Sequence, residues 1–227
     1  MSASPAYAAE KALIVEGDRN RLDRRTWTLA GLGLLATGGV AAVRIEVLAR
    51  TLGVTKGSFY WHFSDRKALL EAILAEWHES TTTSVVEKLW GRPSNARVKL
   101  KRLWQICFSG RTDNPGGRLE TAIRQWALHD VEIARVVAKT DQERLAFIRD
   151  TYADLGVDDP DGMARCFYHY VLGRNALALH SPSNDPRDDI HIQQLLGIEA
   201  GGHLMDGRDR SEVAPSANQD FLKGEPE

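Results

Sequence analysis

The sequence predicts an all-α protein with a small N-terminal helical unit and a larger helical body. Apolar residues recur at helical spacing along most of the chain, and the alternation typical of strands is scarce. The eight prolines fall mostly at apparent breaks between these periodic segments. With 227 residues, of which 43% are apolar, the chain is long enough to bury a sizeable core.

The N-terminal unit is expected to begin with two helices. The first is predicted from about Arg24 to Thr37 and is closed by Gly38–Gly39, because glycine favours helix ends. The second is predicted from about Val43 to Thr51. Gly53 stands where a tight turn needs positive φ, and a short third helix is expected from Thr55.

A longer helix is expected next, with Ser64 as its N-cap and Asp65 in its first turn. One face of this helix carries Leu69, Leu70, Ile73, Leu74 and Trp77. Further amphipathic helices are expected up to about residue 200. Asp130 is placed to cap one of them, and Pro186 to start the last, which should end near Gly201–Gly202.

Positive charge is concentrated near the N-terminus, although the whole chain carries a formal charge of −2. Residues 19–67 contain nine Lys or Arg against three Asp or Glu, a charge of +6, so the remainder carries −8. This asymmetry predicts an anionic partner for the basic segment alone. A solvated basic face without a partner is the alternative that charge by itself leaves open.

No feature of the sequence indicates a membrane protein, a secreted protein or an enzyme. No apolar run reaches the ~18 residues needed to cross a bilayer, and the N-terminus lacks the pattern of a secretory signal. Cys107 and Cys166 lie far apart, which is typical of a reducing cytoplasm and predicts two buried thiols. We therefore expect a cytoplasmic protein without catalytic residues, metal or cofactor.

One apparent cofactor motif is GLGLLA at residues 31–36, which matches the G-x-G-x-x-A fingerprint of dinucleotide binding. That motif requires a preceding strand and a helix N-terminus, whereas these glycines fall inside a predicted helix. We interpret Gly31 instead as a site of close packing between helices.

The segment IEVLARTLGVTKGSFYWHF, residues 45–63, has the spacing of a helix-turn-helix: small Ala49, then Gly53, then hydrophobic Phe59. In this motif the second helix enters the DNA major groove, and its N-terminal residues face base edges and phosphates. Those residues are Thr55, Lys56, Gly57 and Ser58. The glycine allows close approach, the hydroxyls can donate to phosphate, and the lysine can reach either a base edge or a phosphate.

The stretch GVTKGSFYWHFSDRKALLEA resembles the signature of the TetR family of transcriptional regulators, and the match covers about Arg24 to Trp77. The resemblance implies that Tyr60 and His62 touch the DNA phosphate backbone and that Arg66 meets a phosphate at the start of the fourth helix. It also implies that Phe63 packs inside the DNA-binding domain.

Two positions depart from the family pattern. Lys67 stands where the family commonly has an acidic residue, and Arg44 stands where a small hydroxyl residue usually opens the second helix. Both departures add positive charge, so both residues remain candidates for DNA binding. Two points stay open: Tyr60 and His62 could be half-buried rings with satisfied polar tips, and Trp61 is either the edge of the core or a sugar contact.

The resemblance also implies a domain organisation. The expected parts are a flexible tail over 1–20, a helix-turn-helix DNA-binding domain over 21–66, a helical effector-binding and dimerisation domain over 67–204, and a disordered tail over 205–227. Helices at about 161–180 and 186–200 are expected to form the dimer interface as a four-helix bundle. Candidate effector contacts, each of which could instead be a core or surface residue, are Trp104, Phe108, Arg124, Trp126, His129, Phe167, Tyr168 and Asn175.

The function that the resemblance implies is ligand-responsive, sequence-specific regulation of transcription by a homodimer. The expected mode is repression, in which the dimer binds a palindromic operator on double-stranded DNA and a small molecule releases it. Two alternatives remain open at this point. One is a DNA-binding dimer without an effector, and the other is a helical carrier or enzyme for apolar small molecules.

Overall fold

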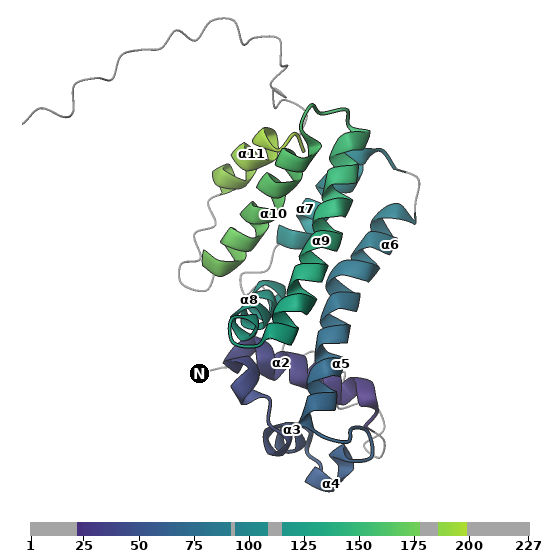
Figure 1. The fold of residues 1–227 in the computed structure, drawn as a ribbon, viewed down its shortest axis with the longest axis vertical. Helices are drawn as coiled ribbons and strands as arrows, with labels where there is room; N and C mark the ends of the chain where they lie inside the picture. Colours follow the sequence, from purple (N-terminus) through teal and green to yellow (C-terminus); the bar gives the residue numbers. More distant parts are fainter. Residues whose placement is uncertain (1–21, 92–93, 109–114, 178–185, 199–227) are drawn as a thin grey trace, which may run out of the picture.

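Helices make up every regular element of the computed structural model, and its described residues contain no strand (Figure 1). The structure describes residues 22–91, 94–108, 115–177 and 186–198. The all-α prediction is therefore confirmed. The tails expected over 1–20 and 205–227 lie outside the described residues.

The head, residues 22–66, occupies the lower end of the molecule in Figure 1. It begins with α2 (Arg24–Ala42), whose N-cap Asp23 accepts a hydrogen bond from the backbone of Thr26 at 2.7 Å. The predicted closure at Gly38–Gly39 is confirmed, because Gly39 takes the non-helical φ 67° and breaks the helix there. A further helical turn then reaches Ala42.

A tight turn in the head joins α3 (Ile45–Leu52) to α4 (Lys56–Phe59). Gly53 takes φ 70° in this turn, as its position in the sequence predicts. The turn is closed by the amide of Val54, which donates to the Ala49 carbonyl at 2.9 Å. The short third helix thus starts within one residue of the predicted position.

A continuous helical rod leads from the head into the body, residues 67–198 (Figure 1). It consists of α5 (Arg66–His78), the π-helical turn η1 (Glu79–Thr83) and α6 (Ser84–Trp90). The N-cap of α5 is Asp65, not Ser64, because the extended backbone of Asp65 lets its carboxylate accept from the Ala68 amide at 2.8 Å. The predicted apolar face is confirmed, since all five of its side chains are buried.

Five further helices complete the body as far as the structure describes it. They are α7 (Ala96–Phe108), α8 (Pro115–Ala127), α9 (Val131–Asp154), α10 (Pro160–Leu177) and α11 (Pro186–Leu195). Asp130 caps α9 as predicted, and α11 starts at the predicted proline. The expected end of α11 near Gly201–Gly202 is wrong, because the helix stops at Leu195 and Gly197 turns with φ 64°.

Two buried apolar clusters organise the packing. The first fills the head and continues into the lower parts of α8 and α9 through Ile123 and Ile133. The second joins α7, α9, α10 and the end of α11 around Trp104, Tyr152 and Phe167. The head is therefore docked on the body through a shared core.

Gly31 in α2 is a point of close helix contact, as the sequence predicts. A Cβ at this position would lie 2.5 Å from Cδ1 of Ile73 on α5. The prediction of two buried thiols is wrong for Cys166, which is exposed, while Cys107 is partly buried. None of the described helices is both long enough and apolar enough to cross a membrane.

Candidate nucleic-acid interface and ligand cavity

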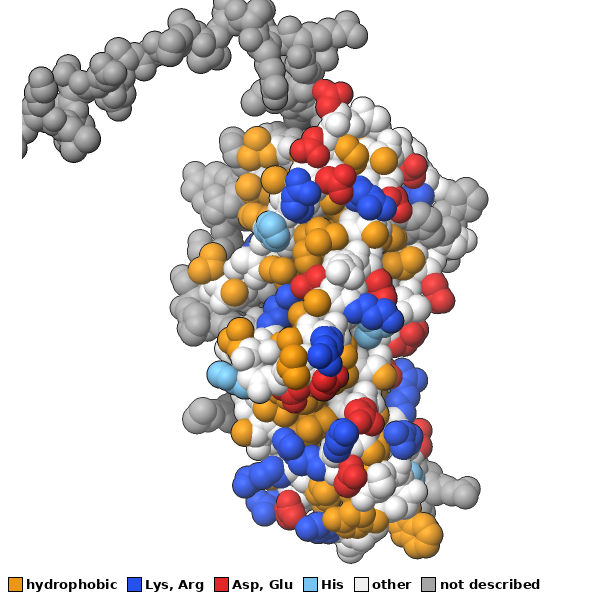
Figure 2. All heavy atoms as spheres, in the orientation of Figure 1, with side chains coloured by type: hydrophobic (Ala, Val, Ile, Leu, Met, Phe, Trp, Pro, Cys, Tyr) orange, Lys and Arg blue, Asp and Glu red, His pale blue; other side chains and the backbone are white. Residues whose placement is uncertain are grey.

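The candidate DNA-binding residues gather on the outer end of the head. Thr55, Lys56 and Gly57 are exposed at the start of α4, and Ser58 is half-buried beside them. Figure 2 shows Lys and Arg side chains at this lower end of the molecule. The arrangement presents hydroxyls, a cation and an accessible backbone on one convex surface.

Lys56 is held in place by an acidic neighbour. Its Nζ lies 2.6 Å from Oε1 of Glu46 on α3, and both side chains are more than half exposed. The hydrogen bond between them lowers the pKa of the Glu46 carboxyl and raises that of the Lys56 ammonium. Because exposed pairs of this kind are weak, a phosphate or base edge can replace Glu46 as the partner of Lys56.

The aromatic run separates into buried and exposed rings. Phe59 and Phe63 are buried as predicted, with ring centroids 5.4 Å apart in a stacked arrangement. Tyr60 is 53% exposed and Trp61 is 88% exposed. The core-edge interpretation of Trp61 is therefore wrong, because its ring projects into solvent. His62 is half-buried.

Two arginines hydrogen-bond to backbone carbonyls of the head. Arg24 donates from Nη1 to the His62 carbonyl at 2.7 Å, and its guanidinium lies 4.2 Å from the centroid of the Phe63 ring. Arg66 donates from Nε to the Val43 carbonyl at 2.6 Å and from Nη2 to the Val40 carbonyl. The sequence reasoning missed Arg24, and in this structure Arg66 ties α5 to the end of α2.

The two departures from the family pattern are both exposed. Arg44 is the N-cap residue of α3 and makes no side-chain capping bond. Lys67 lies in the first turn of α5, with Nζ 3.9 Å from Oε1 of Glu71 one helical turn away. Neither side chain is buried against the protein, so both can face an anionic partner.

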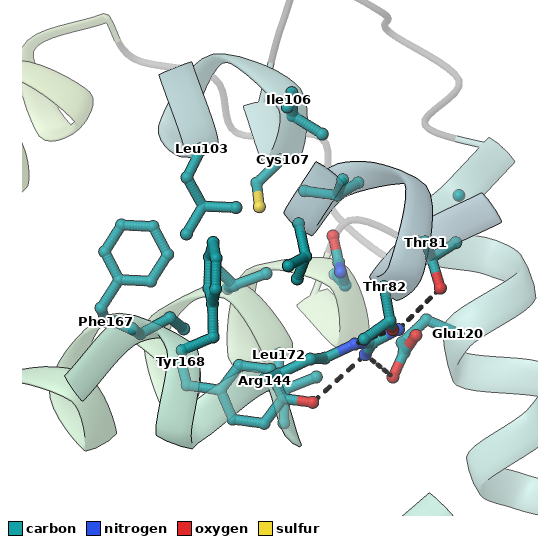
Figure 3. Close-up of a pocket in the computed structure, with 18 of the residues that line it drawn as sticks. Thr81, Thr82, Leu103, Ile106, Cys107, Glu120, Arg144, Phe167, Tyr168 and Leu172 are labelled. Atoms are coloured by element: carbon teal, nitrogen blue, oxygen red, sulfur yellow. Dashed lines mark hydrogen bonds and ion pairs between the residues drawn. The ribbon is translucent and has the colours of Figure 1, made fainter. Parts of the chain in front are cut away.

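A cavity of about 210 Å³ lies in the body between η1, α6, α7, α8, α9 and α10. Figure 3 shows the side chains of Leu103, Ile106 and Cys107 on one side of it, and Arg144 with Glu120 and Tyr168 on the other. Burial raises the pKa of the Cys107 thiol to about 12, so this sulfur stays protonated.

The polar side of the cavity is a closed network of charges. Glu120, which is 6% exposed, accepts from Arg124 at 2.9 Å and from Arg144 at 3.1 Å. Asp141 pairs with Arg124 at 2.6 Å and accepts the hydroxyl of Tyr168 at 2.6 Å. Two cations face two anions, so the network has no net charge.

The surroundings of Tyr168 and Arg144 shift the pKa values of both groups upward. Burial raises the pKa of Tyr168 above its usual range, so the ring remains a neutral phenol. Burial alone would lower the pKa of Arg144, but the interactions with Glu120 and Tyr168 together outweigh burial and raise that pKa. Within the described residues, no group of three His, Cys, Asp or Glu side chains could hold a metal ion.

Comparisons with known proteins find sequence relatives for the head. Residues 29–73 match the family model for bacterial regulatory proteins of the tetR family. The regulator SrpR of Pseudomonas putida is 39% identical over 46 residues, which are 20% of this chain and 22% of that protein. The class G tetracycline repressor protein of Vibrio anguillarum is 40% identical over 53 residues, 23% of this chain and 25% of the repressor. Residues 29–73 thus carry the helix-turn-helix segment of the tetR family of regulatory proteins.

Solved structures extend the likeness in fold to the body. The reduced form of NemR from E. coli superposes with a TM-score of 0.64 at 21% identity, covering 78% of this chain and 99% of NemR. A transcriptional regulator from Saccharomonospora viridis in complex with choline gives 0.60 at 22% identity, covering 77% and 93%. At these identities the likeness concerns the fold. The curated relatives are matched over 20–34% of their own length.

Three of the candidate effector contacts line the cavity of the body, namely Phe167, Tyr168 and Asn175. Five others do not. Trp104 and Phe108 pack against each other and against Tyr170 in an aromatic cluster beside the cavity. They serve as packing residues, as the alternative reading of each allowed.

The remaining three misplaced candidates have identifiable roles. Arg124 stands behind the cavity wall, where it holds Asp141 and the hydroxyl of Tyr168. Trp126 packs against the core of the head, and His129 is exposed just before α9. Polar or aromatic residue type alone does not say which face of a helix meets the cavity, and this is why these three residues do not line it.

Sequence reasoning also missed the polar side of the cavity. Glu120, Arg144 and the hydroxyls of Thr81 and Thr82 all line it. One signal was available, because Glu120 and Arg124 lie four residues apart within a stripe of apolar positions. The run of five hydroxyl residues from 80 to 84, in the middle of an otherwise apolar helix face, was a second signal.

Proposed function

We propose that this protein is a homodimeric, ligand-responsive regulator that binds a palindromic operator, most simply as a repressor. The observation that carries the proposal is the surface at the start of α4, where Thr55, Lys56, Gly57 and Ser58 stand on a rigid core within the family match. The match to a family of regulators also supports a protein that is not an enzyme.

In this proposal α4 enters the major groove of double-stranded DNA. Lys56 leaves Glu46 for a base edge or a phosphate, and the neighbouring hydroxyls donate to phosphates. Tyr60, His62, Arg44 and Lys67 flank α4 and would contact the backbone on either side. Binding to DNA implies a cytoplasmic protein.

Dimerisation follows from the shortness of α4, because one helix of four residues makes too few contacts for specificity. We assign the interface to α10 and α11, as a four-helix bundle across a twofold axis. The two heads would then read half-sites about one DNA turn apart, roughly 34–36 Å. The domain division at residues 66 and 67 is part of the same proposal.

The effector is assigned to the cavity of the body. One structural neighbour was solved in complex with choline, so a protein of this fold can hold a small molecule. Ligand binding would favour a dimer whose heads no longer match the operator. By linkage, the operator must then weaken ligand binding by the same factor.

Selection of duplexes from a random pool, at fixed salt, tests the DNA-binding part. We expect the wild type to enrich a palindrome, Tyr60→Ala to weaken all sequences alike, and Lys56→Ala to relax one base position at a cost of about 1–3 kcal/mol. Lys139→Ala is the matched control, because Lys139 is an exposed lysine on α9, 79% exposed and away from the head. A wild type that enriches no sequence would overturn the proposal.

A further inference from the structure

Arg144 joins the cavity to the helical rod that carries the head. Its Nη2 donates to the Thr81 hydroxyl at 2.7 Å and its Nε to the Thr82 hydroxyl at 2.9 Å. Its Nη1 donates to Glu120 at 3.1 Å and to the Tyr168 hydroxyl at 3.2 Å. Figure 3 shows the guanidinium between these partners at the edge of the cavity.

The two threonines belong to η1, the least regular part of the rod. The Ser84 amide donates to the Glu79 carbonyl, five residues back, and side-chain hydroxyls take over carbonyls of the preceding turn. Thr81 donates to the Trp77 carbonyl at 2.6 Å and Ser80 to the Glu76 carbonyl at 2.7 Å. π turns of this kind are rare and are frequent at functional sites.

Winding at η1 is one determinant of the orientation of the head, beside the core that the head shares with α8 and α9. An α-helix turns by about 100° per residue, and a π turn winds less tightly, so a change of bonding in η1 rotates α5 against α6. Arg144 also stands 5.2 Å from the ring centroid of Trp77, whose Nε1 donates to Glu120 at 3.1 Å. The same cluster thus holds the last turn of α5 and the π turn.

The charges of the cluster decide which ligands the cavity accepts. Both arginines are already neutralised by Glu120 and Asp141, so a carboxylate ligand would lie near Glu120 as an uncompensated buried charge. An ammonium ligand would instead lie next to the cation of Arg144, which would repel it. A cavity of about 210 Å³ is somewhat larger than the ~150 Å³ cavity that holds benzene.

We propose that the cavity takes a small uncharged molecule with an apolar body and one hydrogen-bond acceptor, and that this acceptor draws Arg144 away from Thr81 and Thr82. Loss of the two threonine bonds rewinds η1 and turns the heads, which weakens DNA binding. The proposal rests on the proposed function, since it names the ligand class and the regulation of that same cavity.

Four single-ring probes of similar size test the ligand class: benzyl alcohol, ethylbenzene, benzoate and benzylammonium. Calorimetry on the unbound protein should show benzyl alcohol binding at least about tenfold tighter than either ion. Ethylbenzene should also bind, because its ring and ethyl group can pack on the apolar side of the cavity. A higher affinity for benzoate or benzylammonium, or no binding of benzyl alcohol at millimolar concentration, would overturn the ligand class.

The double variant Thr81→Val/Thr82→Val tests the coupling, because valine keeps the shape of threonine and removes both hydroxyls. Benzyl alcohol should bind it up to about tenfold tighter, since the hydroxyls no longer compete for Arg144. Saturating benzyl alcohol should weaken duplex binding by at least about fivefold in the wild type and by less than about twofold in the double variant. Thr83→Val is the matched control, since Thr83 lies in η1 but contacts His78 rather than Arg144.

Two outcomes would sink the coupling mechanism. One is a double variant that responds to benzyl alcohol as strongly as the wild type does. The other is release of DNA by ethylbenzene, which has no acceptor for Arg144. The probe titrations need no DNA, so they remain interpretable even if the wild type selects no duplex and the proposed function fails.

Discussion

The head and the body hold their cations in opposite ways. In the head, Lys56 pairs with Glu46 in full contact with solvent, and Arg44 and Lys67 are exposed. In the body, Arg144 is almost wholly enclosed and makes four hydrogen bonds to protein groups. An exposed pair costs little to exchange for another partner, whereas a buried pair is costly to break.

This difference suits two kinds of partner. A polyanion can approach the head and take over its cations one at a time, with counterions released as it does so. A ligand in the body must compete with preformed hydrogen bonds, so its binding is coupled to whatever those bonds hold. Under the proposed function, the head would supply affinity for DNA and the body would supply the response to a ligand.

Phe59→Ala should give the largest effect, because it removes a fully buried ring from the core that supports α4. The ring stands 5.4 Å from those of both Trp27 and Phe63. We expect a loss of about 4 kcal/mol in the free energy of unfolding, measured by urea denaturation.

Trp61→Ala is the control for this variant, since it removes a larger ring only two residues away. Because Trp61 is 88% exposed, stability should change by no more than about 0.5 kcal/mol. Equal losses in the two variants would show that Trp61 packs against the protein in solution.

Glu120→Gln should destabilise the body by about 3 kcal/mol, because two partly buried arginines lose the buried carboxylate that they share. Glu143→Gln provides the comparison on α9. Glu143 is 39% exposed and pairs with His78 and Lys139, so its loss should cost less than about 1 kcal/mol. Similar costs for the two variants would contradict the contrast between buried and exposed pairs.

The head was predictable from sequence because its surface is local. All its candidate residues fall between Arg44 and Lys67, and the turn at Gly53 fixes α3 against α4 through contacts a few residues apart. The exposure of Trp61 was not predictable, since it lies in the turn after α4, where helical spacing does not say which ring turns inward.

The polar side of the cavity could not be predicted, because it assembles only in three dimensions. Thr81 and Arg144 are 63 residues apart in the chain, and Glu120 and Arg144 are 24 apart. Helical periodicity places each of these residues on an inner face but does not pair one helix with another. The π turn was equally hidden, because its backbone departs from the α-helical pattern that periodicity assumes.

The smallest expected changes in stability are those of alanine substitutions at two glycines on α2. Gly31→Ala places a methyl 2.5 Å from Cδ1 of buried Ile73, and overpacking of about 1–3 kcal/mol should exceed the gain in helix propensity of about 1 kcal/mol. Gly33→Ala meets nothing within 4 Å, so it should stabilise the protein by up to about 1 kcal/mol. Thermal unfolding of the two variants therefore should shift in opposite directions. If both variants gained stability, Ile73 would have room to move, and the contact between α2 and α5 would be looser than the structure describes.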